Sequence, residues 1–161
     1  MRIKWFSLIR ITGLLLVLLY HFFQTIFPGG FFGVDVFFTF SGFLITALLI
    51  EEFSKNHEID LVGFFRRRFY RIVPPVVLMV LVTMPFTFLV RQDYVAGIGG
   101  QIAGVLGFMT NFYEMLTGGS YESQFIPHLF VHNWSLAVEV HYYVLWGLAV
   151  WLNLLLGSLF G

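Results

Sequence analysis

The stretch FGVDVFFTFSGFLITALLI, residues 32–50, is long and apolar enough to cross a lipid bilayer as a single helix. Asp35 is its one charged residue. The rest of the chain has the same character, because 58% of the 161 residues are hydrophobic and only 11% are charged. Soluble domains carry about 25% charged residues. The composition therefore predicts an all-α integral membrane protein.

Three further apolar segments come close to the ~20 residues that a spanning helix needs. They are residues 8–27, 74–90 and 135–156. We expect about four transmembrane helices in one compact unit, joined by a polar loop over residues 51–71 and a long loop over residues 91–133. The apolar piece 98–109 of the long loop is short and rich in glycine, so we expect it to be interfacial or re-entrant.

Basic residues predict the orientation, because Lys and Arg are enriched in short cytoplasmic loops. They gather around the first segment and in the loop 51–71 (Arg2, Lys4, Arg10, Lys55, Arg66, Arg67, Arg68 and Arg71), whereas the loop 91–133 has only Arg91. Both termini should therefore be cytoplasmic and the loop 91–133 should lie outside. A cleaved signal peptide over residues 1–27 fits less well, because no small-residue cleavage site follows.

Composition also excludes several kinds of site. The chain has no cysteine, which rules out disulfides, thiolate metal sites and a cysteine nucleophile. The formal net charge is zero, and no basic arm or acidic tail points to nucleic acid. We expect no metal cofactor and no nucleic-acid partner.

The first apolar segment carries two ionisable residues, Arg10 and His21. They are eleven residues apart, almost three helical turns, so both should project from one face about 16 Å apart along the axis. His21 would lie beyond mid-membrane, where an ionisable group is costly and is a functional candidate by default. A neutral His21 bonded to a neighbouring helix as packing glue is an equal alternative.

Two carboxylates are expected in the same outer layer as His21, to within roughly 10 Å. Asp35 lies near the outer end of its segment, although the helix macrodipole alone favours an acid there. Glu139 lies about one turn inside the last segment. Its polar neighbours on the same helical face are Ser135, Tyr142 and Tyr143. A histidine and two carboxylates at similar depth would form a buried acid–base cluster.

The basic stretch FFRRRFYRIVPP, residues 64–75, suggests a second site. A helical turn would gather Arg67, Arg68 and Arg71 at the cytoplasmic membrane surface, just before Pro74 ends that helix. Guanidinium groups bind phosphate through paired hydrogen bonds. Ordinary anchoring by positive charge also explains such a cluster, and from these residues alone it is the favoured interpretation.

Four blocks, in this order and spacing, resemble the signatures of the membrane acyltransferase-3 family. They are R-x10-H (residues 10–21), GGFFGVDVFFTFSGFLIT (29–46), FFRRRFYRIVPP (64–75) and HNWSLAVEVHYY (132–143). The resemblance implies an integral membrane enzyme of about ten spanning helices that uses cytoplasmic acyl-CoA to acylate, usually acetylate, hydroxyls of extracytoplasmic carbohydrates. Within the family, the chain looks most like the membrane domain of Gram-positive peptidoglycan O-acetyltransferases.

The resemblance also assigns roles to residues. His21 takes the position of the essential histidine, Arg10 that of its partner, and Glu139 that of the glutamate in the W-S-L-x-x-E block. The arginines associated with the CoA phosphates are Arg67, Arg68 and Arg71, and the supporting positions are Asp35, Ser41, Trp134, Ser135, Tyr142 and Tyr143. Two positions depart from the family pattern: Ser7 replaces a frequent acid, and Tyr142 replaces a common phenylalanine.

By this resemblance, the chain corresponds to the N-terminal part of a larger helix bundle in the plasma membrane. Its partners would be the lipid bilayer, acyl-CoA as donor substrate, a cell-surface glycan as acceptor, and either the remaining C-terminal helices or an extracellular transferase domain. Two other classes stay open. A proton-coupled transporter would also place ionisable residues in its helices, and a truncated, non-catalytic membrane protein would keep the blocks without the activity.

Overall fold

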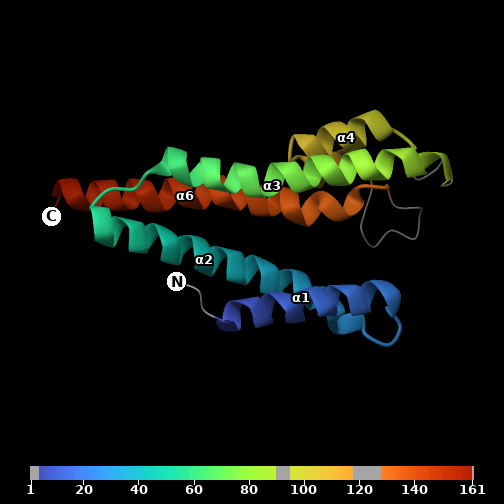
Figure 1. The fold of residues 1–161 in the computed structure, drawn as a ribbon, viewed down its shortest axis with the longest axis horizontal. Helices are drawn as coiled ribbons and strands as arrows, with labels where there is room; N and C mark the ends of the chain where they lie inside the picture. Colours follow the sequence, from blue (N-terminus) through green and yellow to red (C-terminus); the bar gives the residue numbers. More distant parts are fainter. Residues whose placement is uncertain (1–3, 90–94, 118–127, 161) are drawn as a thin grey trace. The chain divides into compact units, whose positions relative to one another are not determined.

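The computed structural model describes residues 4–89, 95–117 and 128–160, and these residues form helices joined by turns (Figure 1). Within these ranges there is no β-strand. The helices group into two units, Met1–His57 and Glu58–Gly161, and each unit is described by itself.

The N-terminal unit is a helical hairpin. Its elements are α1 (Lys4–Phe22), the 3₁₀-helix η1 (Pro28–Phe32) and α2 (Gly33–Asn56). α2 ends where His57 adopts a left-handed conformation (φ 56°) and donates its backbone N–H to the Phe53 carbonyl, a common way to close a helix. α1 packs against both η1 and α2.

Glycines allow this hairpin to close tightly. A Cβ atom on Gly33 would lie 2.6 Å from the Gly13 carbonyl oxygen and 2.8 Å from Cγ2 of Val17. A Cβ atom on Gly30 would overlap the Leu16 carbonyl oxygen. In a bilayer the hydrophobic effect does not drive helices together, so helix association depends on close packing. Small residues at the contact let the two backbones approach closely. The block GGFFG, residues 29–33, therefore sets the packing of α1.

The C-terminal unit is built on two long helices that lie side by side (Figure 1). Its elements are α3 (Leu61–Thr83), η2 (Met84–Leu89), α4 (Ile98–Leu106), α5 (Thr110–Thr117), η4 (Val131–Asn133) and α6 (Trp134–Phe160). Asp60 caps α3, since its Oδ1 accepts a hydrogen bond of 2.8 Å from the Gly63 N–H.

An apolar core joins α3, α4 and the segment before α6. Val76 and Val80 of α3 pack with Val105 of α4 and Phe130, and all four are at most 6% exposed. The short helices α4 and α5 are thus part of the packed unit. They occupy much of the stretch 91–133 that the sequence indicated as a loop.

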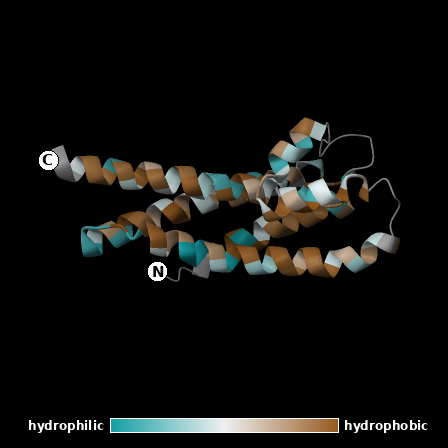
Figure 2. Ribbon diagram, turned by 90° about the horizontal axis from the view of Figure 1, so that it is seen from above, coloured by the Kyte–Doolittle hydropathy of each residue, from teal (hydrophilic) through white to brown (hydrophobic). Residues whose placement is uncertain are grey.

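The predicted fold class is confirmed. Three helical stretches are long and apolar enough to cross a membrane, Pro28–Asn56, Leu61–Thr87 and Val131–Gly157, and Leu8–Phe22 is a shorter apolar helix. Most residues along the long helices are hydrophobic (Figure 2), and many large apolar side chains on them are exposed. The chain is a multi-pass membrane protein.

Two predicted boundaries were wrong. The first helix ends at Phe22, and residues 23–27 form a turn before Pro28 starts η1, so His21 lies in the last helical turn instead of six residues inside it. The turn is closed by the Phe23 carbonyl, which accepts hydrogen bonds from the N–H groups of Ile26 and Phe27.

The predicted polar loop 51–71 was also wrong. It shrinks to residues 57–60, because α2 continues to Asn56 and α3 already begins at Leu61. Pro74 does not end the basic helix: both Pro74 and Pro75 lie inside α3, which continues to Thr83. Each proline removes one helical hydrogen bond, but Val76 and Val80 in the next turn anchor the helix in the core.

Candidate functional site

The N-terminal unit holds Arg10 and His21 on one helix, α1. The guanidinium carbon of Arg10 lies 5.1 Å from the centroid of the Phe40 ring on α2, within the range of a cation–π contact. Ser41 follows Phe40 on the same helix and is half-buried. Arg10 therefore helps to hold α1 against α2.

The hydrogen bonding of His21 defines its tautomer. Its Nδ1 lies 2.8 Å from the Val17 carbonyl oxygen, and a carbonyl can only accept, so Nδ1 carries the hydrogen in this contact. In the neutral ring, Nε2 is then the basic nitrogen. His21 is exposed and its ring meets Tyr20 edge-on, with centroids 5.8 Å apart. This arrangement suits a proton acceptor whose orientation is fixed by the helix backbone.

Asp35 lies in the first turn of α2 and is exposed. An acid at that position interacts favourably with the positive end of the helix. The structure thus gives Asp35 a helix-stabilising role that needs no catalytic function.

The C-terminal unit joins two sequence blocks that are far apart in the chain. The guanidinium carbon of Arg68 on α3 lies 5.2 Å from the ring centroid of Tyr143 on α6 and 5.4 Å from that of Phe64. The hydroxyl of Tyr143 donates a hydrogen bond to Oε1 of Glu139. Arg68, Tyr143 and Glu139 therefore form one connected group across two helices.

The other predicted residues of this unit are distributed around that group. Arg67 and Arg71 are exposed on α3, four residues apart. Tyr142 stacks on Trp146, with ring centroids 5.8 Å apart and the planes inclined by 13°. Trp134 and Ser135 begin α6, and Ser135 Oγ donates to the His132 carbonyl at 3.4 Å.

The sequence placed His21, Asp35 and Glu139 in one cluster. His21 and Asp35 belong to the N-terminal unit and Glu139 to the C-terminal unit. Their association therefore stays a prediction.

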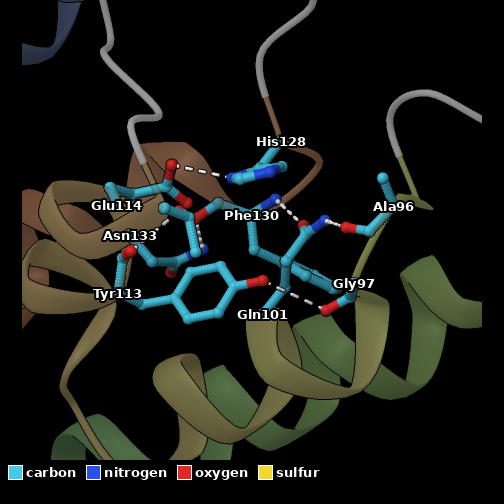
Figure 3. Close-up of polar contacts among 9 residues, drawn as sticks. Ala96, Gly97, Gln101, Tyr113, Glu114, His128, Phe130 and Asn133 are labelled. Atoms are coloured by element: carbon cyan, nitrogen blue, oxygen red, sulfur yellow. Dashed lines mark hydrogen bonds and ion pairs between the residues drawn. The ribbon is translucent and has the colours of Figure 1, made fainter.

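A second polar group was missed by the sequence analysis (Figure 3). His128 Nδ1 lies 2.8 Å from Oε2 of Glu114, and their side chains are only 18% and 8% exposed. Gln101, 1% exposed, donates from Nε2 to the Ala96 carbonyl at 2.7 Å and accepts the Phe130 N–H at 3.3 Å. These bonds tie α4, α5 and the segment before α6 together.

The signal for this group is weak in the sequence. Glu114 and His128 are separated by fourteen positions without a shared periodicity, so only tertiary packing brings them together. Beside them, the buried oxygens Thr110 Oγ1 and Asn111 Oδ1 have no hydrogen-bond partner among the described residues. The only hint in the sequence was Glu114 itself, an ionisable residue within a mixed, partly apolar segment.

Comparison with known proteins agrees with the four sequence blocks. A family described as an acyltransferase domain matches residues 3–160. The O-acetyltransferase OatA of Staphylococcus aureus, in strains COL and MRSA252, is 32% identical over 142 residues, which cover 88% of this chain and 24% of the relative. The chain thus spans about a quarter of the length of these curated relatives. No solved structure matches it.

Proposed function

This chain belongs to the acyltransferase-3 family, and from that premise we propose that it moves an acyl group, most often acetyl, from acyl-CoA to a hydroxyl of a cell-surface carbohydrate. Peptidoglycan is the proposed acceptor, acyl-CoA the cytoplasmic donor, and the plasma membrane the site of action, with both termini cytoplasmic. The match to an O-acetyltransferase over 88% of the chain supports the reaction class.

The observation that carries the proposal is the tautomer of His21. Because Nδ1 donates its hydrogen to the Val17 carbonyl, Nε2 is the nitrogen of the neutral ring that can accept a proton as a general base. In the proposed step, Nε2 takes the proton of the acceptor hydroxyl, and the oxygen attacks the thioester carbonyl. The new C–O bond forms, the C–S bond breaks, and the proton passes to the CoA thiolate. An acyl-tyrosine carrier between donor and acceptor would use the same proton transfers.

Other residues of the family blocks have supporting roles in this scheme. Glu139 takes part in the same reaction as a carboxylate, in keeping with its place in the W-S-L-x-x-E block. Arg10, or a nearby serine or tyrosine hydroxyl, stabilises the negative oxygen of the tetrahedral intermediate. The exposed residues Arg67 and Arg71 hold the CoA phosphates through their guanidinium groups.

Acetyl transfer from labelled acetyl-CoA in proteoliposomes tests the proposal. His21→Ala should abolish transfer, because a positioned base contributes roughly 10²- to 10⁴-fold to the rate. His57→Asn is the matched control: it removes an exposed imidazole at the end of α2, and asparagine tolerates the left-handed conformation there. Transfer by His21→Ala at the rate of His57→Asn would refute the role of His21. Proton-coupled uptake by the wild type without acetyl transfer would favour a transporter.

A further inference from the structure

We infer that Arg68 and Tyr143 are positioning residues for Glu139, so that Arg68 acts on the carboxylate through the tyrosine instead of binding a CoA phosphate. This inference rests on the proposed function, since it assumes that Glu139 takes part in acyl transfer. It separates Arg68 from Arg67 and Arg71, which the sequence places in one phosphate-binding cluster.

The first evidence is the environment of the guanidinium group. Arg68 is half-buried, whereas Arg67 and Arg71 are exposed. Its guanidinium carbon lies within 5.4 Å of two ring centroids, those of Phe64 and Tyr143. A planar, weakly hydrated guanidinium is suited to such contacts, and a lysine ammonium is not an equivalent replacement. Arg68 therefore holds the Tyr143 ring from the α3 side.

The second evidence is the position of Tyr143. Its side chain is 8% exposed, and a buried tyrosine hydroxyl needs a hydrogen-bond partner. That partner is Glu139, one helical turn away on α6. The bond fixes the direction of one carboxylate oxygen. The ring of Tyr143 is held in turn by Arg68.

The third evidence is the register between the two helices. A Cβ atom on Gly147 of α6 would lie 3.5 Å from the Phe64 ring of α3, so these two positions are neighbours. One turn later on α3 and one turn earlier on α6, Arg68 contacts Tyr143. The two pairs, 64 with 147 and 68 with 143, follow a single antiparallel register. The Arg68–Tyr143 contact is thus built into the α3–α6 packing.

This position lies well inside both helices. Arg68 is seven residues from the start of α3, or about 10 Å, and Tyr143 is nine residues from the start of α6, or about 14 Å.

A positioning residue should affect the chemical step, whereas a phosphate ligand should affect donor binding. The two roles therefore separate in kcat and in the KM for acetyl-CoA.

The test uses variants that remove one group at a time. Tyr143→Phe deletes only the hydroxyl and keeps the ring that Arg68 contacts. Tyr70→Phe makes the same chemical change at a residue of α3 that is 70% exposed. Arg68→Lys and Arg67→Lys keep the charge and remove the planar guanidinium. Membrane insertion and helix content of each variant are compared with the wild type by protease protection and circular dichroism.

We expect Tyr143→Phe to lower kcat on the order of 10- to 100-fold, the effect of losing one hydrogen bond to a charged group, with an unchanged KM for acetyl-CoA. Arg68→Lys should also lower kcat without raising KM, whereas Arg67→Lys should raise KM. Tyr70→Phe should match the wild type. A Tyr143→Phe enzyme as active as Tyr70→Phe, or a rise in KM for Arg68→Lys equal to that for Arg67→Lys, would overturn the inference.

An infrared measurement separates failure of this inference from failure of the proposed function. The carboxyl band of Glu139, identified by its loss in Glu139→Gln, should shift in Tyr143→Phe and stay in place in Tyr70→Phe. A wild-type protein without acetyl transfer overturns the proposed function and the catalytic part of the inference together. An active wild type with an unshifted band in Tyr143→Phe overturns the inference alone.

Discussion

Replacing Gly33 by alanine should loosen the N-terminal hairpin. The backbone at Gly33 is right-handed helical (φ −56°, ψ −31°), so alanine adds no backbone strain. Its Cβ, however, would lie 2.6 Å from the Gly13 carbonyl oxygen and 2.8 Å from Val17 Cγ2. The valine methyl can rotate away, but a carbonyl within α1 moves only with its helix. The added Cβ atom should therefore push α1 away from the start of α2.

The size of the effect follows from two opposing contributions. Overpacking costs about 1–3 kcal/mol, and the upper half applies here because a backbone atom is the obstacle. Alanine regains at most about 1 kcal/mol of helix propensity over glycine. We therefore expect Gly33→Ala to lower the free energy of unfolding by about 1–3 kcal/mol.

Gly29→Ala is the matched control, because a Cβ atom there meets nothing within 4 Å. Its effect should stay within about 0.5 kcal/mol. Unfolding of both variants in detergent, by titration with SDS and followed by circular dichroism, gives the comparison. Val17→Ala in the Gly33→Ala background should recover only part of the loss, since it relieves one of the two contacts. Equal stability of Gly33→Ala and Gly29→Ala would refute the close-packing argument.

Two further predictions concern the C-terminal unit. Glu114→Leu leaves Nδ1 of the part-buried His128 unpaired and should cost about 1–3 kcal/mol in the same unfolding assay, whereas Glu51→Leu, which breaks an exposed ion pair with Lys55, should leave stability unchanged. Equal effects of the two substitutions would show that the Glu114–His128 pair adds no stability. Replacing Arg67 and Arg71 together by alanine should raise the KM for acetyl-CoA with little change in kcat, and an unchanged KM in steady-state assays would assign these arginines to membrane anchoring alone.

Sequence reasoning succeeded where length and composition decide the outcome. The apolar runs around residues 32–50 and 135–156 became α2 and α6, because a long apolar stretch with a single carboxylate has few alternatives to a helix in a bilayer. It failed at boundaries where tertiary contacts override local signals. Pro74 was expected to end a helix, yet α3 continues because its next turn is held in the core by Val76 and Val80.

The sequence indicated which residues belong to the site but not which of them contact one another. Family blocks indicated Arg68, Glu139 and Tyr143 separately, and nothing in the spacing of 75 residues shows that Arg68 contacts Tyr143. The Glu114–His128 pair was not predicted at all, since only the packing of α5 with the segment before α6 brings the two side chains together. Contacts across helices depend on register, and one sequence does not determine register.

The paired prolines of α3 have an electrostatic consequence for its arginines. Pro74 and Pro75 have no N–H, so the carbonyl groups of Tyr70 and Arg71 lose the donors that a regular helix would supply. Such carbonyls carry partial negative charge, as they do where a helix terminates, and cations nearby are stabilised by it. The interruption thus provides a local counter-charge, drawn from the backbone itself, for the most positively charged turn of the chain.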